Sequence, residues 1–168
     1  MDVRYGECMA LQTSATIHCT PDLVWAVMTD WSQTAYWLGV GRLRLQDPQQ
    51  PVGVGSRLSS GGSSAGLFVV RQWEPERKLA LETSQLGMTA SYEYCLTESD
   101  GTTRVELLAD CSAANAFFRL LLPALRKLLE RADRGQLKAL KRLTEARVRE
   151  AERKADALQE ASSSHTGE

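Results

Sequence analysis

Residues 15–31 read ATIHCTPDLVWAVMTDW and join a strand pattern to the start of a helix. Within residues 8–19, apolar and small side chains recur at every second position, which is typical of a strand. Thr20 can then cap a helix, Pro21 suits the first helical position, and Asp22 favours the positive end of the helix dipole. We therefore expect one strand followed at once by a short helix.

Further helix and strand patterns follow this stretch. The first helix is expected to end at Asp30-Trp31-Ser32, and a second short helix to run from there towards Leu38. Between residues 40 and 112, strand-like segments alternate with turn signals rich in Gly, Pro, Ser and Asp. The expected strands are 40–46, 54–60, 67–73, 78–84, 88–97 and 102–111. Asp100-Gly101, between the last two strands, is the strongest hairpin signal in the chain.

After Ser112 the apolar spacing becomes that of one long helix. Pro123 lies inside this helix and removes one backbone hydrogen bond, so we expect a kink or a defect there. Beyond Thr144 the sequence is nearly all Glu, Arg, Lys and Ala, and it ends in a serine-rich segment. These patterns predict an α+β fold, with one domain over residues 1–144 and a charged helical extension with a disordered tail over residues 145–168.

The composition is that of a neutral chain with an uneven charge distribution. The 168 residues are 43% hydrophobic and carry 20 Lys and Arg against 21 Asp and Glu. This length fits one domain with a tail, and the near-neutral total argues against nucleic-acid binding. Residues 1–112 have a net charge of −5, however, and residues 113–168 have +4. The basic C-terminal helix is therefore either a solvated face against an acidic body or a surface for an acidic protein or membrane.

Several classes of protein lack support in the sequence. The chain has no apolar run of about 18 residues and no signal-peptide pattern at its N-terminus, so we expect a soluble, cytoplasmic protein. Its four cysteines are widely spaced and form no C-x-x-C pair, and only two histidines could join them, so no metal site is expected. No glycine-rich phosphate-binding motif occurs, and no cofactor is expected.

Few side chains offer catalytic chemistry. His18, at the end of the first strand, fits a solvated or capping histidine better than a catalytic one. Glu106 and Asp110 share one strand face opposite apolar residues, which indicates a solvated outer face. Tyr92 and Tyr94 instead share the face that the long helix should cover, and each buried hydroxyl needs a partner. From the tyrosines alone, a ligand cavity and an internal hydrogen-bond network are equally open.

The order of strand, two short helices, antiparallel strands and long helix resembles the helix-grip fold of the START-like, or SRPBCC, superfamily. That superfamily includes polyketide cyclase/dehydrase and lipid-transport proteins and the birch-pollen allergens. Residues 15–31 look like its opening, in which a strand leads to a helix carrying Pro21, Val24 and Trp25 and then to an aspartate. Later features that fall where the family places them are Trp37, Gly53-Val54-Gly55, Glu74-Pro75 and Asp100–Val105. The likeness covers residues 8–145.

The resemblance implies a curved antiparallel sheet of about six to seven strands that wraps around the long helix and leaves a mostly apolar cavity. By this resemblance, the helix would contribute four ligand-contacting residues, Phe118, Leu121, Leu122 and Leu125. The sheet would contribute Trp73, Thr83, Tyr92 and Tyr94, with Trp37 near the mouth. The family's catalytic residues share no motif, so none is carried over to this chain.

Three hypotheses for function follow. The first is a cyclase-like protein that folds a polyketide or aromatic precursor without a cofactor, by shape control and acid/base help from Tyr92, Tyr94 or Arg71. The alternative is a non-catalytic carrier or sensor for a lipid, quinone or aromatic metabolite, which needs only an apolar cavity. The third is an interaction protein that uses the basic helix Arg126–Lys154 to bind an acidic partner.

Overall fold

The computed structural model describes residues 11–163, apart from 62–65, 86 and 114–115. Within the last helix, side chains are described for residues 135–159. The elements in chain order are β1 (Leu11–Ile17), α1 (Pro21–Met28), the short 3₁₀ helix η1 (Trp31–Gln33), α2 (Thr34–Trp37), β2 (Leu43–Leu45), β3 (Arg57–Ser60), β4 (Leu67–Glu74), β5 (Lys78–Gln85), β6 (Met88–Ser99), β7 (Thr102–Ala113) and α3 (Ala116–Ser163).

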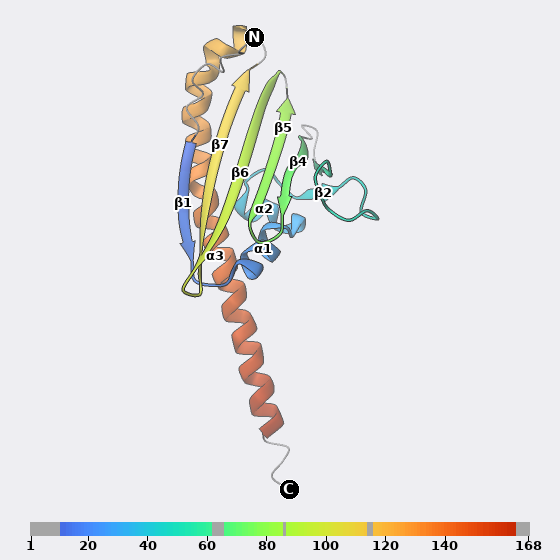
Figure 1. Ribbon diagram of the computed structural model, residues 1–168, viewed down its shortest axis with the longest axis vertical. Helices are drawn as coiled ribbons and strands as arrows, with labels where there is room; N and C mark the ends of the chain where they lie inside the picture. The colour runs from blue at the N-terminus through green and yellow to red at the C-terminus, as the bar shows by residue number, and fades with distance from the viewer. Residues whose placement is uncertain (1–10, 62–65, 86, 114–115, 164–168) are drawn as a thin grey trace.

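The strands form one antiparallel seven-stranded sheet in the order β1-β7-β6-β5-β4-β3-β2. Figure 1 shows α3 running along one face of this sheet and continuing past its end, with α1 and α2 on the same side. The arrangement confirms the predicted α+β helix-grip fold. The hairpin between β6 and β7 is also confirmed: Asp100 and Gly101 both have positive φ, 51° and 73°, as a tight two-residue turn requires.

The start of α1 agrees with the sequence in all but one detail. Thr20 is the residue before the helix, Pro21 occupies its first turn, and Asp22 lies in that turn as predicted. The Thr20 side chain, however, makes no capping hydrogen bond. Its backbone carbonyl accepts from the Val24 N–H at 3.4 Å, so the first turn closes through the main chain alone. At the other end of the chain, α3 continues through Pro123, which does not end the helix.

A bulge in β4 sets which side chains of that strand face the helix. Val70 pairs with Leu81 and Gln72 with Ala80, so Arg71 is an extra residue opposite no partner. Strict alternation from Val70 would turn Trp73 to the outer face. The extra residue shifts the alternation by one position and returns Trp73 to the inner face, where it pairs with the buried Leu79.

The core lies between the inner face of the sheet and α3. Tyr94 is fully buried there, and its hydroxyl donates a hydrogen bond to the Gln136 side-chain oxygen of α3 at 2.9 Å. Leu137, the next residue, and Leu140, one turn further along the helix, are also buried. The sequence left a ligand cavity and an internal hydrogen-bond network equally open for the tyrosines. The Tyr94 hydroxyl belongs to an internal hydrogen-bond network. From residue 149 to 159 every side chain of α3 is exposed, because the helix has passed the end of the sheet.

One buried threonine ties the short helices to the edge of the sheet. The hydroxyl oxygen of Thr34 lies 2.8 Å from the carbonyl oxygens of Trp31 and Gly41, its two alternative acceptors. It also accepts a hydrogen bond from the backbone N–H of Leu43 at 2.8 Å. Thr34 is fully buried and Leu43 is 1% exposed, so water cannot replace this partner. The path of the chain from α2 into β2 depends on this hydroxyl.

Replacing Thr34 by valine should lower the free energy of unfolding by about 2 kcal/mol, because the buried Leu43 N–H loses its acceptor. The same change at the exposed Thr16 of β1 is the control and should alter stability by less than about 0.5 kcal/mol. Urea denaturation followed by tryptophan fluorescence measures both. Equal effects of the two substitutions would contradict the assigned role of Thr34.

Candidate functional site

A cavity of about 330 Å³ opens on the inner face of the sheet, near the β5–β6 turn. Its floor is one continuous row across four strands, in which Phe68 pairs with Thr83, Thr83 with Ala90, and Ala90 with Cys111. Three of these four side chains are small, so the row leaves space beneath whatever covers it. The cavity exists because the side chains at this end of the sheet are too short to fill the inner face.

The rest of the lining is mixed. The remaining described residues around the cavity are Val40, Ser60, Gly66, Gln85, Met88 and Tyr92. No Asp, Glu, Lys, Arg or His occurs among the described lining residues. The volume lies within the range of small-molecule sites, roughly 300 to 1,000 Å³, at its lower end. These features suit a compact, mainly apolar guest.

One polar atom at the cavity lacks a partner. The Thr83 hydroxyl oxygen is buried and makes no hydrogen bond with any residue that the structure describes. The Ser60 hydroxyl, by contrast, accepts from the Gly66 N–H at 3.0 Å and lies 3.3 Å from the Gly66 carbonyl oxygen. A buried hydroxyl without a partner is destabilising, which makes Thr83 the polar group best placed to form a hydrogen bond with a ligand.

Of the residues predicted to contact a ligand, some line the cavity and others lie in the core. Thr83 and Tyr92 line the cavity. Tyr94 does not, because it points into the core towards Gln136. Trp37 packs edge-on against Tyr94, with ring centroids 5.6 Å apart, and is 2% exposed, so it lies within the core and not at a mouth. The ligand contacts of Thr83 and Tyr92 stay a prediction.

Two further candidates lie away from the cavity lining. Trp73 belongs to an aromatic cluster with Trp25 and Trp31, at centroid distances of 4.9 and 6.3 Å. Arg71 was expected to act inside the cavity, and the structure corrects this. As the extra residue of the bulge, it lies on the outer face, where it is exposed and pairs with Glu82 at 2.6 Å.

The helix side of the predicted site cannot be compared in the same way. Phe118, Leu121, Leu122 and Leu125 lie in the part of α3 whose side chains are outside the described residues. Sequence reasoning missed the other lining residues, which are Val40, Ser60, Gly66, Phe68, Gln85, Met88, Ala90 and Cys111. Ala90 and Cys111 gave the one available signal, small residues at inner-face positions, and that signal has no meaning until strand register is known.

Other candidate groups have structural roles. His18 is exposed, as expected for a solvated histidine, and its backbone N–H lies 3.5 Å from a Glu145 side-chain oxygen. Glu106 pairs with Arg104 at 3.0 Å on the outer face. Burial raises the pKa of the Cys19 thiol, with smaller effects from Asp22 and Glu145. A raised thiol pKa keeps Cys19 protonated and poorly nucleophilic.

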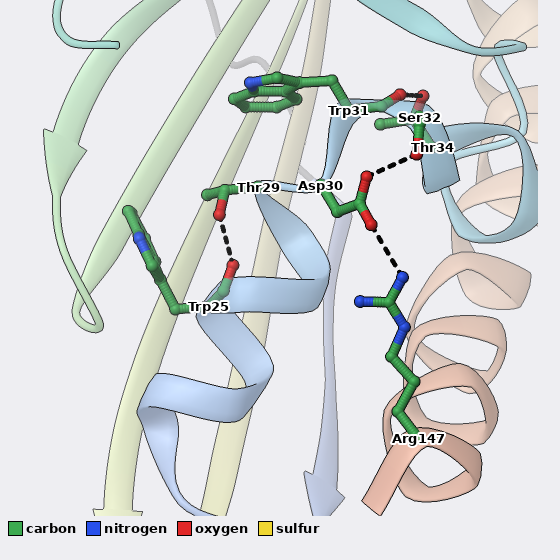
Figure 2. A network of polar contacts seen from close by, with 7 residues as sticks. All are labelled: Trp25, Thr29, Asp30, Trp31, Ser32, Thr34 and Arg147. Carbon is green, nitrogen blue, oxygen red and sulfur yellow. Dashed lines mark hydrogen bonds and ion pairs between the residues drawn. The ribbon is translucent and has the colours of Figure 1, made fainter. Parts of the chain in front are cut away.

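Asp30 joins the loop after α1 to the long helix. Its carboxylate accepts hydrogen bonds from the Ser32 hydroxyl at 2.6 Å and from the Arg147 guanidinium of α3 at 2.8 Å, as Figure 2 shows. Burial alone would raise the pKa of Asp30, but the hydrogen bonds from Ser32 and Arg147 and the charge of Arg147 outweigh it and lower the pKa. This ion pair holds α1 against α3, so the aspartate of the N-terminal motif is structural here.

Some basic side chains of α3 are already engaged within the chain. Lys141 donates to the Thr16 carbonyl at 2.8 Å, Arg147 pairs with Asp30, and Lys154 pairs with Glu150 at 2.7 Å. The acidic partner expected for this helix stays a prediction.

In the part of the chain that the structure describes, no helix is long and apolar enough to cross a membrane. The same part holds no cluster of three His, Cys, Asp or Glu side chains suited to a metal ion.

Comparison with known proteins supplies a family and several similar folds. Residues 9–145 match the model of the family described as polyketide cyclase / dehydrase and lipid transport. No curated protein sequence matches the chain with comparable significance. The structure resembles the Zhui aromatase/cyclase from Streptomyces sp. R1128 with a TM-score of 0.66 and 20% identity, over 86% of this chain and 98% of that one.

Two other solved structures show the same fold. Ara h 8.0201 is matched with a TM-score of 0.65 and 12% identity, over 83% of this chain and 99% of its own. DynU16, a protein in the dynemicin biosynthetic locus, is matched with a TM-score of 0.61 and 18% identity, over 81% of this chain. This chain covers 47% of DynU16, about half its length. Identities this low establish the shared fold alone.

The lowered pKa of Asp30 predicts how stability depends on pH. A carboxyl whose folded-state pKa is lowered stabilises the fold fully above its unfolded-state pKa, and this stabilisation is lost as the pH falls through the folded-state pKa. The difference in free energy of unfolding between the wild type and Asp30→Asn should therefore narrow as the pH falls from about 5 through the lowered pKa of Asp30. Urea denaturation across that range measures it.

Arg147→Gln should reduce the same pH-dependent difference, because it removes one of the donors to Asp30. Arg149→Gln is the matched control, since Arg149 lies two residues further along α3 and is exposed. A difference that stays constant with pH, or that responds equally to both arginine substitutions, would contradict the assigned ion pair.

Proposed function

Because the chain belongs to the polyketide cyclase/dehydrase and lipid transport family, we propose that it binds a hydrophobic small molecule in the cavity on the inner face of its sheet. The observation that carries this proposal is the row Phe68, Thr83, Ala90 and Cys111. A sheet that needed only a packed core would have larger side chains in place of Thr83, Ala90 and Cys111, as it has at Leu79, Leu81 and Leu107.

The reaction that this site best supports is the cyclisation of a polyketide or related aromatic precursor. In such a step the acidic methylene between two carbonyls loses a proton to water, and the enolate carbon attacks a carbonyl carbon of the same chain. A carbon–carbon bond forms while the carbonyl π bond breaks, and the new alkoxide takes up a proton. Loss of water can then give the ring its double bond. Folding the chain so that the two carbons meet is the main requirement, and a cavity of fixed shape supplies it.

Tyr92 is the residue that we assign to this chemistry. It lines the cavity and is 7% exposed, so a hydrogen bond from its phenol to a substrate oxygen would form away from bulk water. Such a bond would stabilise negative charge as it develops on the attacked carbonyl. The similarity of the fold to an aromatase/cyclase is consistent with this use.

A non-catalytic carrier is the second candidate, and the lining itself favours it. The described lining residues include no carboxylate, imidazole or ammonium group to act as a strong general base. A carrier of a quinone, lipid or aromatic metabolite needs only the apolar cavity. Binding and turnover therefore have to be measured separately.

Binding can be tested by filling the cavity. Ala90→Leu places a larger side chain on the cavity floor and should weaken binding of the fluorescent tricycle 1-aminoanthracene by about tenfold or more. Ala80→Leu is the matched control, because Ala80 pairs with Gln72 on the outer face of β5, the strand next to Ala90. Fluorescence titration measures both dissociation constants. Equal affinities of the two variants would place the probe elsewhere.

Turnover can be tested with a linear poly-β-ketone thioester as substrate. For a cyclase, the wild type should change the rate and the distribution of cyclised products, and Tyr92→Phe should reduce that effect by about 10- to 100-fold. Tyr36→Phe is the control, because Tyr36 is 61% exposed and lies outside the cavity lining. Products are resolved by liquid chromatography and mass spectrometry. If the wild type binds 1-aminoanthracene but leaves the thioester products unchanged, the carrier function is correct.

A further inference from the structure

The Thr83 hydroxyl differs from the other hydroxyls near the cavity. Ser60 is engaged with Gly66, and Ser84, the next residue of β5, shares a hydrogen bond of 2.9 Å with Thr89. Thr83 Oγ1 is buried and has no partner. Its position is central, because Thr83 pairs with Phe68 on one side and Ala90 on the other, and both line the cavity.

We propose that Thr83 is the specificity-determining residue of this site, and that its hydroxyl donates a hydrogen bond to a ketone or quinone oxygen of the ligand. This inference rests on the proposed binding function and narrows the ligand to carbonyl-bearing, compact ring compounds. A buried O–H group without an acceptor destabilises the protein, and this cost is removed when a ligand supplies an acceptor. A hydrogen bond from Thr83 to the ligand oxygen would therefore favour binding.

The lining distinguishes a carbonyl from other oxygen groups. A carboxylate would need a cation, and no Lys, Arg or His is among the described residues of the lining. A ketone oxygen accepts hydrogen bonds and donates none, so one O–H donor is enough to satisfy it. The Thr83 hydroxyl can supply such a donor. A pure hydrocarbon would fill the space and leave Thr83 without a partner.

The size of the cavity sets the second limit. About 330 Å³ holds a few fused rings and is small for a long acyl chain. 9-Fluorenone and fluorene are therefore suitable probes, because they share one tricyclic skeleton and differ at a single carbon, which is a carbonyl in the first and a methylene in the second. The comparison isolates the oxygen while the apolar contacts stay nearly constant.

The experiment measures dissociation constants of both probes by displacement of 1-aminoanthracene from the wild-type protein and from Thr83→Val. The affinity ratio of 9-fluorenone to fluorene should fall about five- to tenfold in Thr83→Val, because the variant keeps the shape and loses the donor. Fluorene itself should bind both proteins with similar affinity. Thr97→Val, an exposed threonine on the adjacent strand β6, is the matched control and should leave the ratio unchanged.

A spectroscopic readout tests the hydrogen bond directly. The carbonyl stretch of bound 9-fluorenone should lie at lower frequency in the wild type and in Thr97→Val than in Thr83→Val. An unchanged affinity ratio together with an unchanged carbonyl frequency in Thr83→Val would overturn the inference while leaving the binding function intact. If the wild type binds none of the three tricycles, the proposed binding function fails, and the inference fails with it.

Discussion

A single helix, α3, has to cover the inner face of a seven-stranded sheet, and the bond from the Tyr94 hydroxyl to Gln136 fixes where it does so. Both groups are buried, which makes the contact specific as well as stabilising, because another placement of the helix would leave them without each other. Around this bond the sheet side chains are large. Leu79 and Leu107 of the sheet and Leu140 of α3 are fully buried in the same core cluster.

Strands β5, β6 and β7 have smaller side chains on the inner face near the β5–β6 turn. On β6, two residues before Tyr94, Tyr92 lines the cavity. Two residues before that, Ala90 lies on the cavity floor. The pairing of Thr83 with Ala90 and of Ala90 with Cys111 puts the small residues of three strands in one row. The cavity is thus a consequence of register, because strand pairing gathers short side chains of three strands at one place on the inner face.

Much of the fold could be predicted from the sequence because its signals are local. The cap-proline-aspartate start of α1, the Asp100-Gly101 turn and the period of the strands each depend on a few neighbouring residues. The site depends on contacts that no local pattern encodes. The bulge that keeps Trp73 on the inner face is visible only in the pairing of β4 with β5, and Asp30 meets Arg147 across 117 positions of the chain. Family resemblance directed attention to Thr83, but only the structure shows that its hydroxyl lacks a partner.

The central claim is that the small-residue row forms the floor of a ligand site. The most direct measurement is nuclear magnetic resonance of the complex with 9-fluorenone, in which intermolecular nuclear Overhauser effects report ring protons close to protein methyl groups. The account predicts contacts from the ring to the methyl groups of Thr83, Ala90 and Met88, all on the cavity lining. Contacts confined to the outer face, such as the exposed Leu108 of β7, would contradict it.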